Sequence, residues 1–210
     1  PAEEVYPPGI DVEVGALPAV ATQPGLEDAF RPGHFEGVLQ VVRRLFELVE
    51  PTAACYGEKD WQLLAVVQAM TEAERLGVRI EPVETVREAG GLAMSSRNRL
   101  LTPTARRIAL AIHASLDAAR VAPTPAMAEQ AMGRALDVEG LEVEYAVVRD
   151  AQTLLEPPAR GVGNLRALVA ARVGEPVRQV GPNADENPGG VVRLIDNGPA
   201  CCGPPGSALC

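Results

Sequence analysis

Two serine hydroxyls and an arginine guanidinium stand side by side at Ser95, Ser96 and Arg97. Hydroxyls donate to phosphate oxygens, and the planar guanidinium matches two such oxygens at once. The glycines Gly90 and Gly91 just before them allow the chain to bend away from an apolar, strand-like run. Because α/β sheets bind ligands on loops between a strand and a helix, this segment predicts a phosphate-binding loop. A solvated turn with a surface arginine fits the same residues.

A second segment repeats this order of strand, glycine, cation and helix start. Gly57, Glu58, Lys59 and Asp60 follow a short apolar run and precede another helical pattern. Lys59 is the single lysine among the 19 basic residues of the chain. A sequence that otherwise uses arginine keeps a compact ammonium here, which favours a point charge beside phosphate. Both loops therefore predict contacts to phosphate.

Further blocks of sequence accompany the two loops. They are Tyr6-Pro7-Pro8-Gly9, Arg31-Pro32-Gly33-His34-Phe35, Thr85-Val86-Arg87-Glu88, Leu168 to Gly174 and Arg193-Leu194-Ile195-Asp196-Asn197. In type and order, the whole set resembles the pantothenate synthetase (pantoate–β-alanine ligase) family over most of the chain. The resemblance implies condensation of pantoate with β-alanine at the expense of ATP, through a pantoyl-adenylate intermediate and with release of AMP and pyrophosphate.

The resemblance also implies roles for individual residues. Catalytic roles in neutralising and orienting the ATP phosphates are implied for Lys59, Ser95, Ser96 and Arg97. Contacts to the nucleotide are implied for Gly57, Glu58, Lys59, Asp60, Val86, Met94, Ser95, Ser96 and Arg97. Contacts to pantoate are implied for Val38, Val42, Tyr56 and Leu63, although ordinary helix core explains the two valines equally well. No metal site in the protein is expected, because Mg²⁺ would travel with the nucleotide.

Three departures from the family pattern bear on activity. The family's His-x-Gly-His motif has no counterpart, since His34 and His113 are the only histidines. Leu63 stands where the family has a glutamine that hydrogen-bonds pantoate, at a cost of about 1–3 kcal/mol if pantoate's polar groups stay buried. Gly90 replaces a common acidic residue. We therefore expect the C-terminal portion of a longer parent chain, without the N-terminal half of the nucleotide-binding domain.

Two alternative hypotheses stay open. One is a non-catalytic truncated remnant or interaction module that retains half of the nucleotide site, favoured by the missing motif and by Leu63. The other is an adenylate-forming ligase with a different acid substrate, which rests on Leu63 alone. Under all three hypotheses His34, at a helix start, and His113, inside a helix, are expected to be structural.

Composition narrows the functional classes. The net charge of −9 and the isoelectric point near 4.8 argue against a nucleic-acid surface, which would be basic. The sequence has no apolar run long enough to span a membrane and no signal-peptide pattern, so we expect a cytoplasmic protein. The resemblance implies a homodimer for the full-length parent. Cys55 is expected to be a small buried hydrophobe, and Cys201, Cys202 and Cys210 match no zinc pattern.

Apolar periodicity predicts helices over about 35–50, 61–76, 103–119 and 126–136. In the first of these we expect Val38, Val41, Val42, Leu45 and Val49 to face the core. Strands are predicted over 52–56, 78–86, 141–148, 165–173 and 191–195, and residues 1–30 are expected to form loop with one short strand.

This order of elements predicts the fold class. Strands and helices alternate in the first hundred residues, which favours a parallel α/β sheet, and the resemblance makes it the second half of a Rossmann-like nucleotidyl-transferase sheet. Helices followed by strands then favour a small α+β domain with an antiparallel sheet. We expect domains over 1–101 and 102–198, with a Gly/Pro/Cys tail over 199–210 and an exposed insertion over 175–190.

Overall fold

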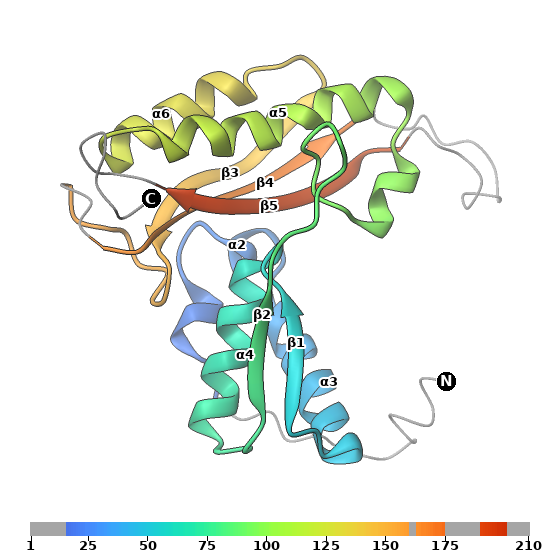
Figure 1. The fold of residues 1–210 in the computed structure, drawn as a ribbon, viewed down its shortest axis with the longest axis vertical. Coiled ribbons are helices and arrows are strands. Elements are labelled where there is room, and N and C mark those ends of the chain that lie inside the picture. Colours follow the sequence, from blue (N-terminus) through green and yellow to red (C-terminus); the bar gives the residue numbers. More distant parts are fainter. Residues whose placement is uncertain (1–15, 160–162, 175–189, 201–210) are drawn as a thin grey trace. The chain divides into compact units, whose positions relative to one another are not determined.

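The computed structural model describes residues 16–159, 163–174 and 190–200 (Figure 1). By its contacts the chain divides into two compact units, Pro1–Glu84 and Thr85–Cys210. The Tyr6–Gly9 block, residues 175–189 of the expected insertion and the three tail cysteines lie outside the described residues.

The first unit is built around a strand–helix–strand element. Strands β1 (Ala53–Gly57) and β2 (Arg79–Val83) pair in parallel, with Ala53 opposite Arg79 and Gly57 opposite Val83. Helix α4 (Trp61–Ala73) connects them, and helix α3 (His34–Val49) precedes β1 (Figure 1). The predicted parallel α/β arrangement is therefore confirmed.

Helix α4 supplies most of the core of this unit. Its side chains Leu64, Val66, Val67 and Met70 are at most 1% exposed. Leu64, Val67 and Met70 are the inner stripe that helical spacing predicts. A helix that is apolar on several sides must be covered on several sides, and here α3, the strands and the N-terminal segment share that task.

The described part of the N-terminal segment forms helical turns, while residues 1–15 of the range in which the sequence predicted one short strand lie outside the described residues. Between residues 16 and 30 the described chain forms a 3₁₀ turn, η1 (Ala19–Thr22), and a short helix, α2 (Glu27–Phe30). The buried amide of Gln62 holds them against α4, because its Nε2 donates to the carbonyl oxygen of Val20 at 2.8 Å and its Oε1 accepts from the backbone N–H of Glu27 at 3.2 Å. Local apolar content did not reveal this tertiary anchor.

Two predictions of burial in this unit are wrong. On α3 the expected core residues Val41, Leu45 and Val49 are exposed, while Val42 is buried and Val38 is partly buried. The helix is apolar on two adjacent stripes, and periodicity cannot choose which of them meets the core. Cys55 is also exposed rather than buried. Successive strand residues point to opposite faces, and its neighbour Tyr56 is the one that packs on the core.

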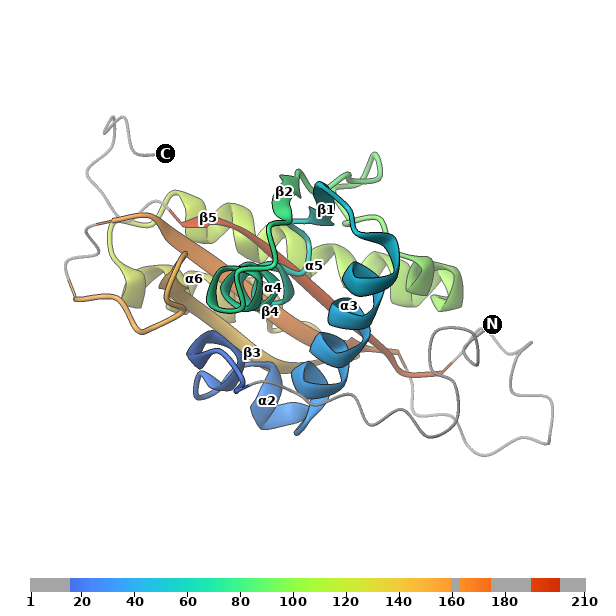
Figure 2. The same ribbon diagram turned by 90° about the horizontal axis from the view of Figure 1, so that it is seen from below.

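The second unit is a helix pair packed on an antiparallel sheet. Helices α5 (Pro103–Arg120) and α6 (Pro125–Leu136) cover one face of the strands β3 (Leu141–Asp150), β4 (Leu165–Val173) and β5 (Val192–Ala200) (Figure 2). Thr102 and Thr124 cap the two helices, each followed by proline at the first helical position. The predicted α+β architecture is confirmed.

The boundary between the units lies earlier than the sequence suggested. The second unit begins at Thr85, whereas the sequence placed the boundary between residues 101 and 102. Leu92 and Leu101 belong to the core of the second unit, together with Ile112 and Val169. The sequence boundary followed the start of a helix, but the loop before that helix is packed with it.

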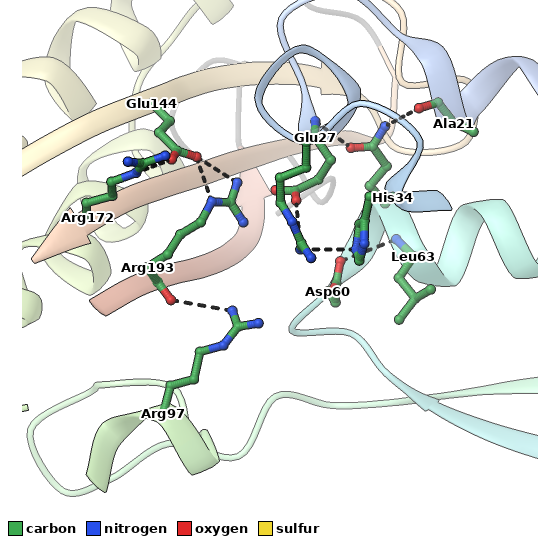
Figure 3. A network of polar contacts seen from close by, with 11 residues as sticks. Ala21, Glu27, His34, Asp60, Leu63, Arg97, Glu144, Arg172 and Arg193 are labelled. Atoms are coloured by element: carbon green, nitrogen blue, oxygen red, sulfur yellow. Dashed lines mark hydrogen bonds and ion pairs between the residues drawn. The ribbon is translucent and has the colours of Figure 1, made fainter. Parts of the chain in front are cut away.

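A bulge in β3 organises the face of the sheet away from the helices. Arg172 on β4 lies directly opposite Arg193 on β5, and like charges in that position repel. The register of β3 shifts between Val143 and Tyr145, which leaves Glu144 as an extra residue aimed between the two arginines. Its carboxylate accepts from Arg172 Nε and from Arg193 Nε, each at 2.7 Å (Figure 3).

Replacing Glu144 with glutamine tests this role. The Glu144 side chain is 4% exposed, so Glu144→Gln leaves two opposed guanidiniums with one neutral acceptor between them. We expect the free energy of unfolding to fall by about 1–3 kcal/mol in chemical denaturation. The matched control is Glu139→Gln, an exposed residue in the turn before β3, which should change little. Equal losses in both variants would contradict the assignment.

Candidate functional site

The loop after β1 connects the strand directly to the first turn of α4. The backbone N–H of Glu58 donates to the carbonyl oxygen of Val83 at 2.8 Å, which extends the strand pairing into the loop. Asp60 is the N-cap of α4, and its Oδ1 accepts from the backbone N–H of Leu63 at 3.4 Å (Figure 3). Lys59 lies between these two fixed points. The predicted phosphate cation therefore sits at a helix N-terminus, where backbone N–H groups also favour anions.

Gly57 lies at the end of β1, in a backbone conformation that residues other than glycine also adopt. Its φ is not among the positive values that glycine alone adopts easily. A Cβ built on Gly57 meets no heavy atom within 4 Å, and the residue is exposed. The backbone is thus open to close approach at the position where the sequence predicted a nucleotide contact.

Three of the four predicted pantoate residues line the outside of the first unit's core. Val42 is a member of the buried cluster, and Val38, Tyr56 and Leu63 pack against it while staying partly exposed. Burial raises the pKa of the Tyr56 phenol above its ordinary value, so it stays protonated as a hydrogen-bond donor. All four side chains therefore belong to or pack against one apolar cluster, and Leu63 is held there by apolar packing.

The predicted phosphate-binding loop of the second unit begins with a tight turn between Arg87 and Ala93. Arg87 and Ala93 form an isolated antiparallel bridge, and the N–H of Met94 donates to the carbonyl oxygen of Val86 at 2.9 Å. Val86 and Met94 leave this bridge with exposed side chains. The bend is at Gly91, whose φ of +89° belongs to the left-handed region.

The serines and the arginine follow directly on a 3₁₀ turn, η2 (Ser96–Leu100). Ser95 is its N-cap, since its Oγ accepts from the N–H of Arg97 at 3.2 Å. The side chains of Ser96 and Arg97 are exposed. Arg97 Nη1 donates to the carbonyl oxygen of Arg193 on β5 at 3.4 Å, a long contact that Figure 3 shows. Met94, Ser96 and Arg97 are therefore exposed along one edge, and Ser95 between them is partly buried.

Asn98 holds this edge from beneath, a role that the sequence analysis missed. It is buried, and its Nδ2 donates to Glu88 Oε1 at 2.8 Å and to the carbonyl oxygen of Ala93 at 3.0 Å. Arg106 from α5 pairs with Glu88 and donates to the carbonyl oxygen of Asn98 at 2.9 Å. The hydrogen bond from Asn98 is the largest cause that lowers the pKa of Glu88, and the hydrogen bond from Arg106 is the second. A polar residue inside a motif was visible in the sequence, but its burial was not.

Both histidines lie in helices and contact nearby side chains. His34 begins α3, and its Nε2 lies 3.1 Å from Nη1 of Arg31. His113 lies in α5 under Gly91, with Nε2 3.5 Å from Asp117 Oδ2. Within residues 16–159, 163–174 and 190–200, no group of His, Cys, Asp and Glu side chains could hold a metal ion. In the same ranges no helix is both long and apolar enough to cross a membrane.

Comparison with protein families gives a match over nearly the whole chain. The sequence model of the family described as pantoate-beta-alanine ligase matches residues 1–199. A pantothenate synthetase from Nocardioides sp. is 39% identical over 99% of this chain and 60% of its own length. One from Rubrobacter xylanophilus is 46% identical over 80% of this chain and 54% of its own length. The chain thus spans little more than half the length of these two relatives.

Solved structures give the same picture. Pantothenate synthetase from Thermus thermophilus superposes with a TM-score of 0.80 at 37% identity, over 94% of this chain and 66% of that one. Pantoate-beta-alanine ligase from Francisella tularensis, complexed with beta-gamma ATP and β-alanine, gives 0.64 at 25% identity, over 94% of this chain and 61% of that one.

The turn at Gly91 offers a direct test of the loop geometry. A Cβ on Gly91 would lie 2.0 Å from His113 Cδ2, in a backbone conformation that L-residues rarely adopt. We expect Gly91→Ala to lower the free energy of unfolding by about 2 kcal/mol or more in chemical denaturation. Gly133→Ala, on an open helical site, should instead stabilise by about 0.5–1 kcal/mol. A Gly91→Ala protein as stable as the parent would refute this turn.

Proposed function

The chain belongs to the pantoate–beta-alanine ligase family, and from that premise we propose that it carries out the ATP-dependent joining of pantoate to β-alanine. A carboxylate does not condense with an amine unaided, because hydroxide or oxide is a poor leaving group. In the proposed sequence a pantoate carboxylate oxygen attacks the α-phosphorus of ATP, and pyrophosphate leaves. The β-alanine amine then attacks the carbonyl carbon of the adenylate, so that AMP leaves with that oxygen and the amide of pantothenate forms.

The protein's part in such a reaction is mainly positioning and charge stabilisation. Negative charge moves onto the departing pyrophosphate in the first step, so cations and hydrogen-bond donors aimed at phosphate lower the barrier. We assign this task to Lys59 on the helix α4 N-terminus, and to Ser95, Ser96 and Arg97 on η2. Mg²⁺ is proposed only as a companion of the nucleotide phosphates, since the described residues offer it no ligand cluster.

The remaining residues are assigned to binding. Gly57, Glu58 and Asp60 would contact the nucleotide beside Lys59. Val86 and Met94 would do so from the exposed ends of the Arg87–Ala93 bridge. Val38, Val42 and Tyr56 would hold the methyl groups of pantoate, in line with their position around one apolar cluster.

The observation that most supports a nucleotide site is the open backbone at Gly57. Nothing in the described chain requires glycine there, because the φ is ordinary and a methyl group would fit. A glycine at the end of β1, two residues before the single lysine of the chain, is accounted for if a ligand lies against its Cα.

Leu63 favours a second candidate function. Its side chain packs against an apolar cluster and offers no hydrogen bond to a bound hydroxy acid. Gln62, the adjacent amide, is occupied by Val20 and Glu27 and does not replace it. A ligase of the same type that uses a less polar acid fits this observation, and so does a protein that has lost catalysis. Competing acids in the assay below separate these candidates.

Two substitutions in one loop test the proposal, in the protein as its source produces it. Gly57→Ala should leave stability unchanged or raised by about 0.4–1 kcal/mol, because the native backbone accepts alanine. It should nevertheless raise the KM for ATP roughly tenfold, since the methyl group would overlap the ligand. Lys59→Ala should reduce pantoate-dependent AMP release at least about a hundredfold with the fold retained.

The outcomes divide clearly. Unchanged AMP release in Lys59→Ala would refute the role of the lysine, and an unchanged KM in Gly57→Ala would refute a ligand at Gly57. AMP release that depends on another hydroxy acid, and not on pantoate, would favour the altered ligase. No adenylate formation with any acid would favour the non-catalytic candidate.

A further inference from the structure

A nearly buried ion pair connects the start of the phosphate loop to strand β5. Asp196 on β5 has a side chain only 3% exposed, and Arg87 pairs with it through both terminal nitrogens. Arg87 Nη1 lies 2.6 Å from Asp196 Oδ2, and Nη2 lies 3.1 Å from Oδ1. This is the bidentate geometry that only a guanidinium provides.

The same guanidinium also contacts the backbone on both sides of the pair. Nη1 donates to the carbonyl oxygen of Gly91 at 3.1 Å, at the bend of the loop. Nη2 donates to the carbonyl oxygen of Asn197 at 3.3 Å, on β5. One side chain therefore joins the loop bend to the strand by four hydrogen bonds. None of these acceptors lies on η2 itself.

A second contact repeats the connection at the far end of the loop. Arg97 Nη1 donates to the carbonyl oxygen of Arg193, three residues before Asp196 on the same strand. The loop is thus hydrogen-bonded to β5 at two places. One is Arg87, which also binds the bend at Gly91, and the other is Arg97, the guanidinium that we assign to phosphate. The sequence analysis quoted both motifs that contain Arg87 and Asp196 but gave neither residue a role.

We infer that Arg87 and Asp196 are positioning residues for ATP, which rests on the phosphate role proposed for Ser95, Ser96 and Arg97. The pair does not touch the nucleotide. It fixes the carbonyl of Gly91, and with it the path of the chain into Met94 and Ser95, so that the hydroxyls and the guanidinium are arranged before ATP arrives. Ordering this edge in advance lowers the entropic cost of binding and of reaching the in-line geometry.

Stability alone does not require such an arrangement. A buried ion pair is weak support for a fold, because desolvation offsets much of the attraction, and apolar residues of similar size often serve equally well. Apolar residues could not reach the Gly91 carbonyl. The planar guanidinium of Arg87 therefore distinguishes a positioning role from a packing role. Replacing it with lysine removes the bidentate geometry and keeps the positive charge.

The test compares Arg87→Lys and Asp196→Asn with the control Arg107→Lys, an exposed arginine on α5 that bonds Thr104. Hydrogen exchange is measured at the N–H groups of Gly91 and Met94 and in the core around Ile112 and Val169. Titration with a non-hydrolysable ATP analogue and steady-state kinetics follow. We expect faster exchange in the loop with an unchanged core, about tenfold to a hundredfold weaker nucleotide binding, and an unchanged KM for β-alanine.

Each outcome is decisive. Loop exchange and analogue affinity equal to the parent in both variants would overturn the inference. Equal loss of protection in loop and core, or failure of both variants to fold, would also overturn it, since the pair would then support the whole unit. If the parent protein shows no pantoate-dependent turnover, the proposed function fails. The exchange and analogue-binding data then still decide whether the pair positions the loop.

Discussion

A carboxylate withdrawn from water must have a cationic or hydrogen-bonding partner, and two such carboxylates organise the second unit. Glu144 from the β3 bulge lies between two opposed arginines, and Asp196 on β5 receives Arg87. A third carboxylate, the partly exposed Glu88, receives Asn98 and Arg106. The last two pairings hold the same loop from opposite ends. Their common product is an exposed edge of hydroxyl and guanidinium groups on a fixed backbone.

The first unit reaches a comparable result by packing instead of charge. Helix α4 is buried by side chains on several sides, so its N-terminus is held firmly at the end of β1. Asp60 caps the helix, and the chain before it offers an uncovered glycine and the single lysine. In each unit a capping residue, Asp60 or Ser95, both holds a helix start and is proposed to contact the nucleotide.

Elements with strong local signals were predictable from the sequence. Thr-Pro at residues 102–103 and 124–125 marks both helix starts, and a nearly continuous apolar run marks β4, whose Ala167, Val169 and Ala171 belong to the core shared with the helices. Predictions failed where a tertiary choice decided between equal local options. The exposed stripe of α3, the exposed Cys55 and the helical turns before residue 30 are such cases. The bulge at Glu144 depends on Arg172 and Arg193, which lie far along the chain. The burial of Asn98 depends on the folding of its own loop against Glu88, which no sequence pattern indicates.

The central claim is that this chain serves an acid–amine ligation through an acyl adenylate. It is tested most directly by labelling the pantoate carboxylate with ¹⁸O and incubating it with ATP, β-alanine and the protein from its source. Attack on the α-phosphorus leaves one labelled oxygen in AMP, which mass spectrometry detects as a shift of about two mass units. The account predicts labelled AMP in step with pantothenate formation. Label in inorganic phosphate together with ADP, or pantothenate formed with unlabelled AMP, would contradict it.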